Sequence, residues 1–115
     1  MRKNTAILWL ILWTITLAAD ADTASEIDHL LNFIGASDCD FIRNGDKHDA
    51  AAARDHIQRK YAYAKRWIET TEQFIEYAAT KSSTTGKSYS VICAGREEPS
   101  ADWLTRELIR FRASP

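Results

Sequence analysis

The sequence is poor in residues that cross-link or interrupt a chain, with two cysteines, two prolines and four glycines among 115 residues. This length allows a single domain. The formal net charge is −1 and no block of five like charges occurs, which argues against a nucleic-acid arm or a membrane-surface patch. The chain also lacks a Gly-x-Ser-x-Gly element and a His-x-x-x-His pair, so two common catalytic signatures are missing.

An apolar run occurs close to the N-terminus. Met1-Arg2-Lys3 is basic, the stretch 5–17 carries no charge, and Ala19-Asp20-Ala21 has the small-x-small form that signal peptidase cleaves. A spanning helix needs about 20 apolar residues, so an uncleaved anchor is the less favoured alternative. We expect a signal peptide over 1–21, a mature domain over 22–115, periplasmic localisation and no stable membrane anchor after cleavage.

Both cysteines, Cys39 and Cys93, lie in the mature chain. An isolated pair of cysteines in an oxidising compartment indicates a disulfide rather than a metal site or a nucleophile. Closing a loop of this length would stabilise the fold by about 4 kcal/mol. No cysteine lies near the cleavage point, so a lipoprotein is not expected.

Periodicity and capping residues predict four helices. Thr23 to Glu26 has the form of a capping box before the first helix, and Gly35 is expected to end that helix. Asp46 is expected to cap a long second helix. The remaining predicted elements are helices over 47–68, over 70–78 and from 99 onward, and short strands over 39–43 and 89–93.

The cysteine pairing suggests a strand register. If Cys39 faces Cys93 in an antiparallel pair, Phe41 faces Val91 and Arg43 faces Tyr89. This register brings the turn 43–45 beside the loop at 86–87. The predicted fold class is α+β, mainly α: about four helices packed with a short two-stranded antiparallel pair that one disulfide staples.

Three blocks of the sequence together form a recognisable pattern. They are 41–60, with Phe-Ile-Arg-Asn-Gly, two histidines and a lysine; 68–75, with Thr-x-Glu-Gln-Phe-Ile; and 82–89, with Ser-Ser-x-Thr-Gly-Lys-x-Tyr. These blocks resemble the YfeK-like family of small exported bacterial proteins, a domain of unknown function. The resemblance implies an exported protein and brings no activity. Ala52, Gln58 and Ser88 depart from the usual family pattern, and the first two weaken acid–base chemistry on the long helix.

Two surfaces are candidates for binding. The first, here called the loop surface, is rich in hydroxyl groups and comprises Arg43, Asn44, His48, Ser82, Ser83, Thr85, Gly86, Lys87 and Tyr89. Its hydroxyl and basic groups could donate hydrogen bonds to a sugar or a carboxylate; the alternative is an ordinary solvated loop. The second, the helix flank, follows helical spacing and comprises His56, Lys60, Tyr63 and Trp67. Here we favour the alternative that the C-terminal helix packs on it.

We predict a non-enzymatic binding or accessory protein whose partner is an envelope protein or a cell-wall component, with no cofactor, metal or nucleic acid. Two alternatives stay open. One is a small envelope hydrolase that uses His48 or His56. The other is an inhibitor of a cell-wall hydrolase, because Thr85-Gly86-x-x-Tyr89 is similar to an inhibitory loop of some periplasmic lysozyme inhibitors.

Overall fold

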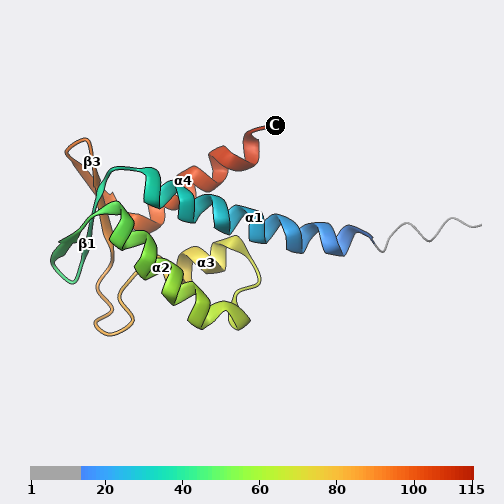
Figure 1. Ribbon diagram of the computed structural model, residues 1–115, viewed down its shortest axis with the longest axis horizontal. Coiled ribbons are helices and arrows are strands. Elements are labelled where there is room, and N and C mark those ends of the chain that lie inside the picture. The colour runs from blue at the N-terminus through green and yellow to red at the C-terminus, as the bar shows by residue number, and fades with distance from the viewer. Residues whose placement is uncertain (1–13) are drawn as a thin grey trace, which may run out of the picture.

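The computed structural model describes residues 14–115, with side chains from residue 22 onward. Most of the predicted signal peptide therefore lies outside the described residues. Helix α1 spans Thr14–Ala36, α2 spans Ala50–Ala64 with a short 3-10 extension over Lys65–Trp67, α3 spans Thr71–Ala78, and α4 spans Ser100–Ala113. Strands β1 (Asp40–Arg43), β2 (Asp46–His48), β3 (Ser90–Cys93) and β4 (Arg96–Pro99) form one sheet. The sheet lies at one end of the molecule and the helices extend from it (Figure 1).

The α+β, mainly helical class is confirmed, and the predicted strand pair is the centre of a larger sheet. The strands are antiparallel in the order β2-β1-β3-β4. Phe41 pairs with Val91, as the predicted register requires. Cys39 and Cys93 form the predicted disulfide, with their Cα atoms 4.8 Å apart.

Two predicted helix starts are wrong. α1 runs without a break through Thr23, because the alanine-rich stretch before it contains no residue that stops a helix. Asp46 does not cap α2, since residues 46–48 form β2. Asp49 caps it instead, accepting a 2.8 Å hydrogen bond from the backbone N–H of Ala52. By contrast, the predicted capping box at Thr70 and Gln73 of α3 is confirmed.

The core lies between the four helices and one face of the sheet. Phe41 and Val91 bring this face of the sheet into the core, and α2 contributes small side chains that let its neighbours approach closely. The largest fully buried apolar side chains are Phe74, Leu30, Ile34, Leu104, Leu108 and Val91. No helix among the described residues is both long and apolar enough to cross a membrane.

The chain is built from two similar halves. Each half runs helix, hairpin, helix: α1-β1-β2-α2 and then α3-β3-β4-α4. Both hairpin turns end on a glycine with positive φ, Asn44-Gly45 at 53° and 83° and Ala94-Gly95 at 52° and 79°. Equivalent positions of β1 and β3 pair across the centre of the sheet at Phe41 and Val91. The two halves are therefore related by an approximate two-fold axis through this pair.

Candidate functional site

The hairpin β1–β2 presents Arg43 and His48 on one face of the sheet. His48 pairs with Phe41 in the register, and side chains alternate along a strand. Phe41, Arg43 and His48 therefore share the face that packs against α2. Asn44 and Gly45, both with positive φ, make the tight turn between the strands.

The loop between α3 and β3 lies against this turn. Asn44 donates a hydrogen bond from Nδ2 to Ser82 Oγ (3.2 Å) and accepts one at Oδ1 from the Thr85 hydroxyl (2.5 Å). The predicted meeting of these two polar segments is therefore confirmed. It joins residues that are far apart in the sequence into one surface.

The loop has a closed internal structure. Ser82 is only 5% exposed, and its Oγ accepts from the backbone N–H groups of Thr84 and Thr85. Backbone bonds from Ser82 N to Lys87 O and from Gly86 N to Ser82 O close it further. Ser82 thus holds the loop together from beneath, whereas Ser83, Thr85, Gly86 and Lys87 are exposed.

Arg43 occupies the centre of the region and contacts two histidines. Its Nη1 lies 2.8 Å from Nδ1 of His56 on α2, and its Nη2 lies 3.4 Å from Nε2 of His48. The same Nη1 lies 3.1 Å from His56 Nε2, and Nε2 lies 3.2 Å from the hydroxyl of Tyr89.

Lys60, one turn further along α2, completes this group. Its Nζ donates to the backbone carbonyl of Lys81 (2.8 Å) and to the Tyr89 hydroxyl (3.0 Å), and lies 4.9 Å from the Tyr89 ring centre. We call Arg43, His48, His56, Lys60 and Tyr89 the Arg43 cluster.

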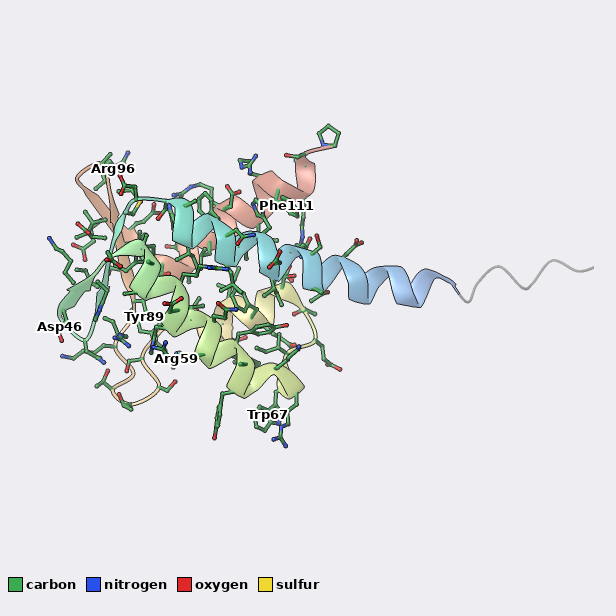
Figure 2. All side chains as sticks on the ribbon, in the orientation of Figure 1. Asp46, Arg59, Trp67, Tyr89, Arg96 and Phe111 are labelled. Carbon is green, nitrogen blue, oxygen red and sulfur yellow. A yellow bond between two sulfur atoms is a disulfide. The ribbon has the colours of Figure 1, made fainter. Side chains whose placement is uncertain are left out.

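The helix flank is thereby divided. His56 and Lys60 belong to the Arg43 cluster, whereas Tyr63 and Trp67 are 83% and 56% exposed. Figure 2 shows Trp67 at the far end of its helix, away from Tyr89. The expectation that the C-terminal helix packs on the flank is wrong, because Tyr89 and the loop before it cover its buried half.

Neither cation of the cluster, Arg43 or Lys60, forms an ion pair within the part of the chain whose side chains are described. Burial, and after it the charge of Arg43, lowers the pKa of His56 to about 4. The same two causes lower the pKa of Lys60. Burial raises the pKa of Tyr89, so His56 and Tyr89 are neutral hydrogen-bonding groups at neutral pH.

A small pocket opens beside the cluster. Its accessible volume is about 20 Å³, room for roughly one water molecule. The walls are apolar, from β1 and the first turns of α2, and the polar lining comes from the cluster and from α4. The lining residues are Phe41, Ile42, Arg43, His48, Ala52, Ala53, His56, Ile57, Tyr89 and Ser100.

The arrangement can bind an anion more readily than it can activate a nucleophile. Both histidines of the cluster contact a cation, whereas a hydrolytic triad orients its histidine with a carboxylate. Among residues 22–115, no group of three or more His, Cys, Asp or Glu side chains is placed to hold a metal ion.

Comparison with known proteins gives the family. Residues 21–112 match the family of unknown function DUF5329. The chain belongs to this family. It is also 35% identical over 92 residues to "Uncharacterized protein YfeK" of Salmonella typhimurium, covering 77% of each chain. Both findings confirm the resemblance drawn from the sequence, and no solved structure matches.

Sequence patterns did not identify Ser100 as a pocket residue of this DUF5329 protein. Ser100 was expected only as the start of the last helix, and its backbone N–H donates to the Tyr89 carbonyl oxygen. This bond holds the first residue of α4 next to Tyr89 of the Arg43 cluster. No local sequence signal gives that placement, since it depends on β4 pairing with β3.

Proposed function

We propose that this DUF5329 protein is an exported, non-enzymatic protein that binds a partner in the cell envelope through the loop surface. Export is supported by the basic and apolar N-terminal sequence and by the Cys39–Cys93 disulfide, because disulfides persist mainly in oxidising compartments. The partner class, an envelope protein or a cell-wall component, follows from that location.

The observation that carries the proposal is a pair of cations, Arg43 and Lys60, without an ion pair among the described residues and beside a hydrogen-bonded polar loop. Arg43 contacts two histidines rather than a carboxylate. Asn44 donates a hydrogen bond to Ser82 and accepts one from Thr85, and these two bonds hold the loop beside the turn. Fixed donors lose less entropy on binding than mobile ones, so this surface suits recognition of an acidic partner.

Affinity capture with the tagged, oxidised protein tests the proposal. Wild type is compared with an Arg43→Ala/Lys87→Ala variant in periplasmic extract of the source bacterium. The matched control is Lys47→Ala/Arg96→Ala, which removes the same charge from two exposed hairpin positions. Lys47 pairs with Ile42, so its side chain lies on the other face of the sheet from Arg43.

The proposal expects one partner that wild type and the control retain and that the Arg43→Ala/Lys87→Ala variant loses. Thermal unfolding and intact mass must first show that each variant is folded and oxidised. Equal capture by all three proteins would place binding elsewhere, with exposed Tyr63 and Trp67 tested next.

A further inference from the structure

One residue that lines the pocket, Ser100, has a polar atom whose hydrogen-bonding capacity is unused among the described residues. Ser100 is 1% exposed, and its Oγ has no hydrogen-bond partner among the described residues. A buried hydroxyl without a partner is unfavourable and uncommon in folded proteins. Its position on the lining of the pocket indicates that a group entering the pocket supplies the partner.

The equivalent position in the other half of the chain supports a role for this hydroxyl beyond folding. Ser100 and Ala50 both begin a helix directly after a hairpin, and both are buried. Alanine therefore suffices for the structure at this position. The half that faces the Arg43 cluster is the one that carries the hydroxyl.

The charge and the walls of the pocket restrict what can enter. Arg43 lines the pocket and Lys60 contacts Tyr89 beside it, and neither cation has an ion-pair partner within the described part of the chain. Phe41, Ala53 and Ile57 make the inner walls apolar. An anion is favoured by the charge, but the walls offer too few donors for a fully solvated dianion such as phosphate.

We propose that the mouth of this pocket binds a small carboxylate carrying a short aliphatic group, with one carboxylate oxygen in the space that holds about one water molecule. Arg43 supplies the opposite charge, the Ser100 hydroxyl donates a hydrogen bond to that oxygen, and the aliphatic group stays at the open side of the pocket. This inference rests on the proposed function and deepens it by naming the ligand class of the same site. The carboxylate can come from a free short-chain acid or from the C-terminus of a peptide that ends in alanine.

Amide-resolved NMR titration of the oxidised protein tests this inference with four probes: propionate, N-acetylalanine, inorganic phosphate and the neutral control propionamide. Saturable shifts at Tyr89, Ser100 and the His56 ring are expected with one or both carboxylates and not with propionamide. Tighter binding of N-acetylalanine than of propionate would indicate that the natural ligand is the C-terminus of a peptide. Tighter binding of propionate would indicate that it is a free short-chain acid.

Three variants connect the shifts to the pocket. Arg43→Gln is expected to weaken carboxylate binding about tenfold, and Ser100→Ala several-fold, as loss of a hydrogen bond to a charged group predicts. Lys47→Gln, with the same charge change on the other face of the sheet, is expected to leave affinity unchanged. Ser100→Ala is expected to fold because Ala50 occupies the equivalent position.

The inference is overturned if neither carboxylate shifts these residues, if propionamide shifts them equally, or if phosphate binds best and is insensitive to Ser100→Ala. Such a result leaves the proposed function standing if capture of the envelope partner still depends on Arg43 and Lys87. Loss of that dependence, with carboxylate binding intact, would instead overturn the proposed function and retain the pocket.

Discussion

Arg43 connects its own hairpin to two other parts of the molecule. Its side chain contacts His56 of α2, and His56 in turn contacts Tyr89, the residue directly before β3. All three arginines of α4 have carboxylate partners, such as Arg112 with Glu26 and Glu72. Arg43 contacts the imidazole rings of His48 and His56 instead. The charge of Arg43 is thus left without an ion-pair partner among the described residues.

The titration of His56 follows from this contact. Burial and Arg43 hold its pKa at about 4, below the ordinary 6.5. We expect the ring to stay neutral down to about pH 5 and Arg43→Gln to raise its pKa. Because the unfolded chain binds this proton more readily, His56 reduces stability as pH falls from about 6.5 towards 4. NMR titration of the ring carbons checks this; an unchanged pKa in Arg43→Gln would contradict it.

A second residue-scale prediction concerns Glu107, which is 6% exposed and contacts His29 (2.6 Å) and Arg110 (2.6 Å). The hydrogen bond from Arg110, followed by that from His29, lowers its pKa to about 2. The stabilisation is present above about pH 4.5 and is lost as pH falls towards 2. Glu107→Gln should lower the free energy of unfolding by about 2 kcal/mol, measured in urea at pH 7, whereas exposed Glu97→Gln should change little.

Some helices, turns and strands could be predicted from the sequence, and others could not. The capping box of α3, the turn at Asn44-Gly45 and the pairing of Phe41 with Val91 follow from short-range signals or from the cysteine pair. Strands β2 and β4 were missed because Asp46–His48 and Arg96–Pro99 are short and mostly charged. Such edge strands lack the apolar alternation that identifies a strand, and their partners determine them.

At the element scale, the Thr70 cap gives a direct prediction. Thr70 Oγ1 accepts from Gln73 N (3.1 Å), and the Gln73 side chain reaches back to Thr70 N (3.2 Å). Thr70→Ala should lower the free energy of unfolding by about 1 kcal/mol, the usual effect of losing an N-cap. Thr105→Ala, at an exposed position within α4, is the control, and equal effects of the two substitutions would contradict the capping role.

The two halves of the molecule are related by an approximate two-fold axis, but the two ends of the central β1–β3 pair carry different residues. Cys39 and Cys93 join one side of the central strand pair. By the symmetry of the register, Tyr89 and Arg43 occupy the corresponding positions on the other side. One side is therefore closed covalently, and the other holds the Arg43 cluster and the pocket. The sequence did not reveal this repeat, because the two hairpins share little beyond the glycines of their turns.

The disulfide gives the whole-molecule prediction. Its two cysteines are 54 positions apart, and the chain-entropy model predicts a stabilisation of about 4 kcal/mol. Cys39→Ser/Cys93→Ser should lose about this much in urea unfolding, and a reductant should weaken wild type but leave the variant unchanged. Equal stability of the oxidised and reduced wild type would show that the core alone holds the two halves together.

The central claim is that Arg43 serves a partner rather than the fold. The most direct test is the quantity of envelope partner captured by Arg43→Gln relative to Lys47→Gln, with both proteins shown to be folded. We predict that Arg43→Gln loses most of the partner and that Lys47→Gln retains it. Full capture by Arg43→Gln would contradict the claim and leave Arg43 as a structural residue of the hairpin.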